Sequence, residues 1–124
     1  MSNSQFVVDF IARGEAPDEW LMVLVENGPW TEPIEVELSR LQNRLYDCMD
    51  AAIDGQLASK FPESNGKRIT IRIDGYMLPV PEIQSFFKRF TEGVIWQGGY
   101  AADIEKSPFV ASIEFLLKLN SDLN

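Results

Sequence analysis

Histidine is absent from this 124-residue chain, and cysteine occurs only once, as Cys48. Without histidine the chain lacks the commonest general base, the usual zinc ligand and every Ser-His-Asp or Cys-His nucleophile arrangement. A single cysteine excludes an internal disulfide, and with no histidine beside it a zinc site is disfavoured. We therefore expect no catalytic residue, no metal site and no cofactor, and predict that the protein is not an enzyme.

Long apolar runs are also missing. No segment approaches the roughly 18 consecutive apolar residues that a membrane span needs. The first five residues, MSNSQ, have neither the basic nor the apolar region of a secretory signal. These absences predict a soluble, cytoplasmic protein that makes no contact with a membrane.

Basic residues are scarce, with 11 Lys and Arg against 19 Asp and Glu, a net charge of −8 and a pI near 4.4. A surface this negative repels phosphate backbones, so we expect no nucleic-acid partner. It would attract a basic protein, although acidity also keeps many cytosolic proteins in solution.

Glycine-rich nucleotide motifs are lacking too, since no Gly-x-Gly-x-x-Gly fingerprint occurs. Gly66-Lys67 resembles the end of a phosphate-binding loop. However, Phe61 stands where the first glycine of that loop belongs, and Arg68 stands where its Ser or Thr belongs. We reject a phosphate loop at this position.

The composition that remains is that of an ordinary globular protein, with 45% hydrophobic and 24% charged residues. A chain of this length can bury a core without disulfides or metals. We predict a single domain over residues 1–124, with residues 1–5 and 120–124 frayed at its ends.

The longest regular pattern predicts a helix over residues 33–55. Its apolar residues recur at spacings of three and four, so they fall on one face within roughly 100° of one another. The residues of this stripe are Ile34, Leu38, Leu41, Leu45, Cys48, Met49 and Ala52. Gly55 suits the left-handed end of the helix. The place of Cys48 on the stripe is typical of a buried, unreactive thiol.

Three segments around this helix predict strands. Residues 6–12 and 20–25 are apolar and are separated by a turn sequence, which indicates an antiparallel hairpin. Residues 67–74 alternate between apolar and polar side chains. The inward residues of that strand are Ile69, Ile71 and Ile73. The outward face of the sheet is expected to carry Val7, Ile11, Thr70 and Arg72.

A second helix is predicted from Pro81, ending at Gly98-Gly99. Its apolar positions are Ile83, Phe86, Phe87, Phe90 and Val94. Residues 109–119 fit a strand, because every odd position is apolar, and also fit a helix begun by Ser107-Pro108. We favour the strand, because such regular alternation is harder to obtain by chance. The order strand, strand, helix, strand, helix, strand predicts an α+β two-layer sandwich. We expect a mainly antiparallel sheet of about four strands with two helices on one face.

Several short motifs accompany this order of elements. They are Val7-Val8-Asp9, Pro29-Trp30, Leu41-Gln42 with Leu45, Gly55, Phe61-Pro62, Lys67-Arg68 and Leu78-Pro79. In these features the chain, over roughly residues 6–94, resembles a family of small bacterial proteins classed as a domain of unknown function. The resemblance implies the same fold. It implies no catalytic residues, because the family has none assigned, and residues 98–108 look longer than the family pattern.

Two groups of residues are candidates for binding. Asp47, Asp50 and Asp54 share the solvent face of the long helix and could in principle hold a hard cation, although three acidic residues on one face are more often a solvated surface. Aromatic residues in loops or at element ends can anchor a partner or cap the edges of the core. They are Trp30, Tyr76, Trp96 and Tyr100.

Three functions remain open. The first is a non-enzymatic acidic interaction protein, in its most concrete form an immunity- or inhibitor-type protein that binds a basic partner and steers it with Asp47, Asp50 and Asp54. The second is a small-molecule-binding or regulatory module with a pocket between helices and sheet. The third, which we disfavour, is a metal-dependent hydrolase. A homodimer would follow if Val7, Ile11 and one face of residues 20–25 were exposed together.

Overall fold

The computed structural model describes residues 8–94 and 99–120. The elements in these residues, in chain order, are β1 (Phe10–Arg13), β2 (Glu19–Asn27), α1 (Ile34–Asp54), α2 (Gln56–Lys60), the 3-10 turn η1 (Pro62–Ser64), β3 (Lys67–Tyr76), α3 (Val80–Gly93), α4 (Tyr100–Lys106) and β4 (Val110–Leu119). Among the helices so described, none is both long and apolar enough to cross a bilayer.

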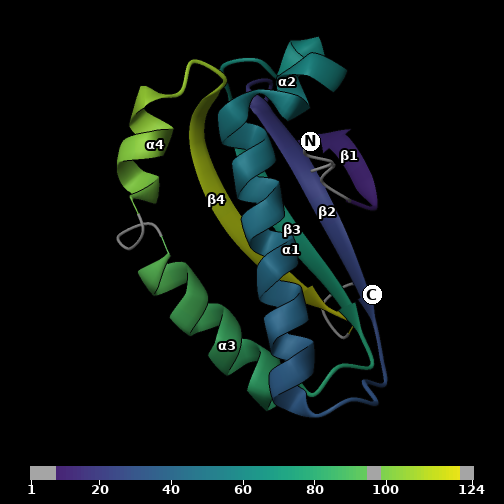
Figure 1. Cartoon of the computed structure of the whole chain (residues 1–124). Helices are drawn as coiled ribbons and strands as arrows, with labels where there is room; N and C mark the ends of the chain where they lie inside the picture. The colour runs from purple at the N-terminus through teal and green to yellow at the C-terminus, as the bar shows by residue number, and fades with distance from the viewer. Residues whose placement is uncertain (1–7, 95–98, 121–124) are drawn as a thin grey trace, which may run out of the picture.

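The four strands form one sheet in the order β1-β2-β3-β4 (Figure 1). β1 pairs with β2 antiparallel, whereas β2 with β3 and β3 with β4 are parallel. The α+β class is confirmed, and the prediction of a mainly antiparallel sheet is wrong. The physical reason is that a helix which packs back across the sheet returns the chain to the end where the preceding strand began.

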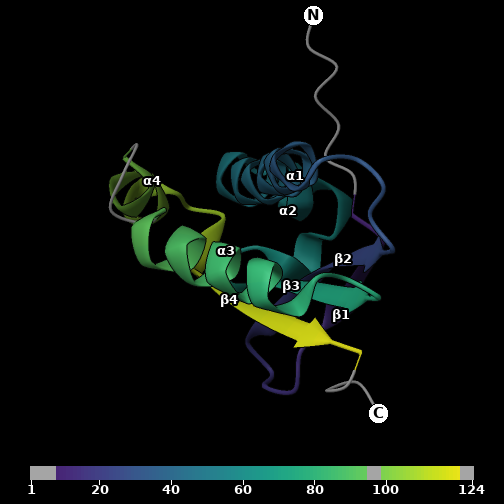
Figure 2. The same cartoon turned by 90° about the horizontal axis from the view of Figure 1, so that it is seen from below.

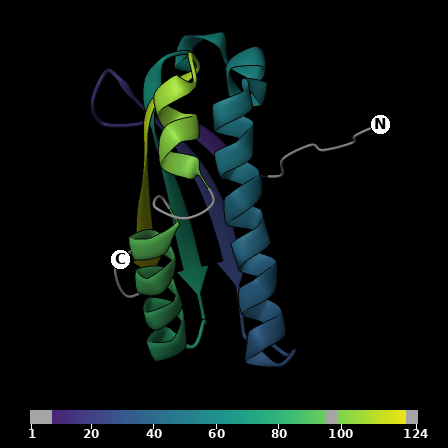
Figure 3. The ribbon, with the colours of Figure 1, turned by 60° about the vertical axis from the view of Figure 1, so that its left-hand side comes forward.

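Helices α1 and α3 lie on the same side of the sheet, as expected (Figure 2). The described residues contain two further helices, α2 directly after α1 and α4 between α3 and β4. Figure 3 shows α3 and α4 following one another along β4, with α1 beside them. The ring of Tyr100 on α4 stacks on Tyr46 of α1, with 5.9 Å between the ring centres. The predicted second helix corresponds to α3, whereas α4 begins after the predicted end at Gly98-Gly99 and was not predicted. Residues 95–98 lie outside the described part.

The apolar stripe of α1 forms the centre of the core. Leu41, Leu45, Cys48 and Met49 are completely buried. The helix ends where predicted, because Gly55 adopts the left-handed conformation with φ 96°. Cys48 is buried, as predicted, and this burial raises the pKa of its thiol to about 12.

The sheet supplies the other half of the core. Ile69, Ile71 and Ile73 of β3 are fully buried, which confirms their predicted inward direction. They meet alternate residues of β2 and the apolar face of α3, a set that includes Trp20, Met22, Leu24, Ile83, Phe86 and Phe90.

The opposite face of the sheet is polar in the middle. Thr70 lies there as predicted, and its hydroxyl donates to Glu19 at 2.8 Å. Arg72 forms an ion pair with Asp74 at 2.8 Å. The prediction for Ile11 is wrong, because the register pairs Ile11 with Met22 and so places it against the helix-side core. Val7 lies outside the described residues. The homodimer predicted from the sequence required Val7 and Ile11 to be exposed together on one face, and Ile11 does not lie on that face.

β4 confirms the strand prediction for residues 109–119. Its register along β3 shifts once, because Lys67 faces Val110 while Arg68 faces Ser112. Ala111 is thus an extra residue in β4, as in a β-bulge. Beyond this point the pairing continues regularly to Leu119 opposite Gly75.

Candidate functional site

The carboxyl ends of β2 and β3 lie side by side, because the two strands are parallel and Asn27 faces Tyr76. The segments that follow β2 and β3 then turn toward the helix layer, where α1 begins at Ile34 and α3 begins at Val80. The two strand ends and the two helix starts therefore meet at one end of the molecule (Figures 1 and 3). We call this region the strand-end site.

The two loops of the strand-end site touch through their backbones. The amide of Gly28 donates to the carbonyl of Tyr76 at 2.6 Å. A Cβ atom on Gly28 would lie 2.0 Å from the carbonyl oxygen of Met77, so only glycine fits between the loops. Met77 itself has φ 60°, a left-handed conformation that non-glycine residues seldom adopt. Strained backbone of this kind is concentrated at functional sites.

A cleft of about 440 Å³ opens between these loops. Its lining residues are Pro29, Trp30, Glu32, Ile34, Met77, Leu78, Pro79 and Glu82. Six of these eight residues are apolar, and the other two are glutamates. Because Glu32 and Glu82 sit at the starts of α1 and α3, the partial positive charge of both helix ends is already offset. The chemistry of the cleft therefore suits a cationic or apolar group better than an anion.

Exposed apolar side chains surround the cleft. Met77 is 64% exposed, and Tyr76 before it and Val80 at the start of α3 are also exposed. Val36 in the first turn of α1 is a further exposed apolar residue, and the acidic Glu35 lies next to it in the chain. This end of the molecule thus presents apolar groups beside carboxylates, which is a combination found at protein interaction surfaces.

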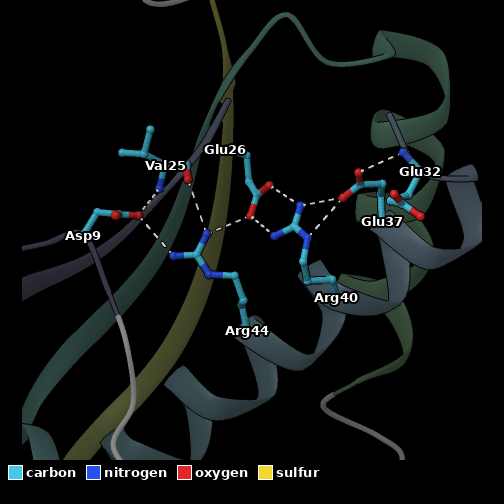
Figure 4. Close-up of polar contacts among 7 residues, drawn as sticks. All are labelled: Asp9, Val25, Glu26, Glu32, Glu37, Arg40 and Arg44. Carbon is cyan, nitrogen blue, oxygen red and sulfur yellow. Dashed lines mark hydrogen bonds and ion pairs between the residues drawn. The ribbon is translucent and has the colours of Figure 1, made fainter. Parts of the chain in front are cut away.

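A network of charged side chains links α1 to β2 next to the strand-end site (Figure 4). Glu26 is 3% exposed, and its carboxylate accepts hydrogen bonds from Arg40 at 2.7 and 3.0 Å and from Arg44 at 2.7 Å. Arg40 also donates to Glu37 at 3.0 Å, and Arg44 donates to Asp9 at 3.1 Å. Carboxylates and guanidinium groups therefore alternate along the whole network, and every charge has an opposite neighbour.

The network fixes the electrostatics around Trp30. Burial alone would raise the pKa of Glu26, but the hydrogen bonds from Arg40 and Arg44 hold it below its ordinary value of 4.5. Glu26 raises the pKa of Arg40 further above its already high value. The Arg40 guanidinium lies 5.9 Å from the centre of the Trp30 ring, within cation–π range. The network thus holds the aromatic wall of the cleft in place.

The candidate residues predicted from the sequence lie at two ends of the molecule. Trp30 lines the cleft, and Tyr76 adjoins it. Asp47, Asp50 and Asp54 lie on the exposed face of α1 toward its other end. The structure therefore brings Trp30 and Tyr76 together at the cleft and Tyr100 together with Asp50 at the other end of α1. Trp96 lies outside the described residues.

The three aspartates also differ in what they contact. Asp50 accepts a hydrogen bond from the Tyr100 hydroxyl at 2.9 Å, and Asp54 accepts bonds from the backbone N–H of Gln56 at 3.1 Å and from its side-chain Nε2 at 2.9 Å. Over residues 8–94 and 99–120, no group of three or more carboxylates or thiols is placed to hold a metal ion. Asp47 and Asp54 remain available for long-range attraction of a partner, whereas Asp50 also anchors α4.

Sequence reasoning missed the Glu26 network and the contribution of Met77. A signal for the first was present, because Glu26 continues the alternation of Trp20, Met22 and Leu24 and so falls on the buried face of its strand. A buried carboxylate requires cations, and Arg40 and Arg44 are four residues apart on the neighbouring helix. No sequence signal marks Met77, whose position depends on how the two loops meet.

Comparison of the chain with protein-family models, with curated proteins and with solved structures found no match.

Proposed function

We propose that the protein is a non-enzymatic interaction module that binds a basic, partly apolar segment of another protein at the strand-end site. The observation that carries this proposal is the position of the exposed, left-handed Met77 in the same cleft as the carboxylates of Glu32 and Glu82. An apolar anchor surrounded by charges of one sign favours a partner with an apolar side chain flanked by cations.

The net charge of −8 supports the proposal at longer range, because it attracts a basic partner before contact. Asp47 and Asp54 would contribute to this steering, and Glu32 and Glu82 would contact the bound segment. The most specific form of the proposal is an immunity- or inhibitor-type protein that covers a basic toxin or enzyme.

A matched pair of double variants tests the strand-end site. We expect Glu32→Gln with Glu82→Gln to weaken binding of a labelled peptide of alternating lysine and leucine about tenfold at low salt, since two contacting charges are lost. The control Asp47→Asn with Glu92→Gln changes the net charge equally but lies on other surfaces, and it should lower affinity by less than about twofold. Fluorescence anisotropy measures both.

Salt dependence and a reversed peptide complete the design. The difference between the two double variants should shrink as salt is raised, because exposed charges are screened. A peptide of alternating glutamate and leucine should not bind. Equal losses in both double variants would show attraction to net charge alone and would contradict a defined site.

A second candidate function, small-molecule binding in the same cleft, is favoured by one observation. The indole nitrogen of Trp30 is buried and has no hydrogen-bond acceptor among the described residues. Such a donor suits a ligand oxygen that would satisfy it. In a thermal-shift screen of metabolites, this function predicts a saturable rise in melting temperature that Trp30→Phe abolishes. A flat response across the screen would count against it.

A further inference from the structure

β4 is a long edge strand. It pairs with β3 on one side, and in the described part of the chain no strand pairs with its other side. β1 at the opposite edge is only four residues long, which limits its ability to pair with another chain. β4 has ten residues, so the sheet has one short edge and one long edge.

The long edge has little of the protection that edge strands usually carry. It contains no proline, its bulge at Ala111 affects only the beginning of the strand, and its only charged residues are Glu114 and Lys118. Phe115 and Leu117, on the face toward the helices, are only half-buried. Leu116, on the other face, is 41% exposed.

We propose that two copies of this chain pair antiparallel along β4, with the two-fold axis at Leu116. In this register Leu116 faces its own counterpart on the outward face of the sheet. Toward the helices, Phe115 of each copy faces Leu117 of the other. Apolar side chains that are partly exposed in one copy are thus covered on both faces of the joined sheet.

Charge complementarity selects this register. With the axis at Leu116, Glu114 of each copy stands directly opposite Lys118 of the other. An axis at position 114 would place two glutamates opposite each other, and an axis at position 118 would place two lysines opposite each other, both of which are unfavourable. Within the described residues, no ion pair includes Glu114 or Lys118, although the charge of Glu114 contributes to raising the pKa of Arg68.

In the resulting dimer the strands of both copies form one continuous sheet. A two-fold axis perpendicular to the sheet does not exchange its two faces, so the helices of both copies lie on the same face. Its contacts use none of the residues that line the strand-end cleft. Dimerisation is therefore independent of the proposed function, and either can fail without the other.

Charge reversal tests the pairing. Sedimentation velocity at low salt should show a wild-type dimer. Glu114→Lys and Lys118→Glu should each weaken self-association at least about tenfold, because each places like charges opposite each other twice per dimer. An equimolar mixture of the two single variants should dimerise again, and so should the double variant, because opposite charges then face each other.

A cysteine at the axis tests the register directly. Residues that face each other in antiparallel strands have Cβ atoms about 4.5–5.5 Å apart, near the distance that a disulfide spans. Leu116→Cys should form a covalent dimer under mild oxidation, whereas Ala102→Cys on exposed α4 should not, and buried Cys48 does not compete. A monomeric wild type at about 100 µM, or single reversals that dimerise unchanged, would overturn the proposal.

Discussion

Replacing Gly28 with alanine should lower the free energy of unfolding by about 2–4 kcal/mol, because overpacking and a lost backbone hydrogen bond add together. The new methyl group would lie 2.0 Å from the Met77 carbonyl oxygen and 3.2 Å from the Tyr76 carbonyl oxygen, and these backbone atoms leave it no room. The two loops must separate, which stretches the bond from the Gly28 amide to Tyr76. Urea unfolding measures the loss of stability.

The same substitution should also weaken peptide binding, since Met77 and the cleft move together with the loops. Gly66→Ala is the control. Gly66 has φ 76° and open space around its Cβ position, so alanine there costs only about 1–2 kcal/mol of conformational strain. It should leave binding unchanged. A Gly28→Ala protein as stable as wild type would contradict the close packing of the loops.

Replacing Glu26 with glutamine should cost about 2–3 kcal/mol of stability at pH 7. The change keeps the size of the side chain and removes the charge that Arg40 and Arg44 share. Breaking a fully buried pair costs roughly 3–5 kcal/mol, and the partial exposure of both arginines lets water recover some of that loss. Glu63→Gln is the control, because its ion pair with Arg13 is exposed and should be worth at most about 1 kcal/mol.

The effect of Glu26→Gln should depend on pH. The pKa of Glu26 is lower in the folded protein than its ordinary value of 4.5. A depressed carboxyl pKa stabilises the fold above the ordinary value, and this contribution disappears as pH falls through the folded pKa. The gap between wild type and variant should therefore be widest above pH 4.5 and shrink below it. Urea titrations at several pH values measure the gap, and a constant gap would contradict the assignment.

The amphipathic elements of this fold could be predicted because burial acts on local spacing. The stripe from Leu41 to Ala52 and the alternation of Ile69, Ile71 and Ile73 each determine an element without reference to the rest of the chain. The direction of pairing could not be predicted in this way. Two strands joined by a helix have the same residue pattern whether they end up parallel or antiparallel, and only the path of the helix across the sheet decides.

The candidate site shows the same division. Trp30 and Tyr76 could be singled out because aromatic residues at element ends are visible in the sequence. Their association with Met77, Glu32 and Glu82 depends on two loops about 50 residues apart, and no local pattern records it. The aspartates of α1 were equally visible, but Asp50 serves partly to hold Tyr100. Exposure on a helical wheel cannot distinguish a free carboxylate from one with a tertiary partner.

The strand order β1-β2-β3-β4 follows the order of synthesis. Each new strand can therefore add to an edge that the preceding strand has already formed, and none needs to be inserted between two earlier ones. Only the β1–β2 pairing is local, because each parallel pairing joins residues far apart in the chain, as Glu19 with Arg68 and Lys67 with Val110. The sheet can therefore grow from β1 toward β4 only as each intervening helical segment is completed, which makes the later pairings the slow ones.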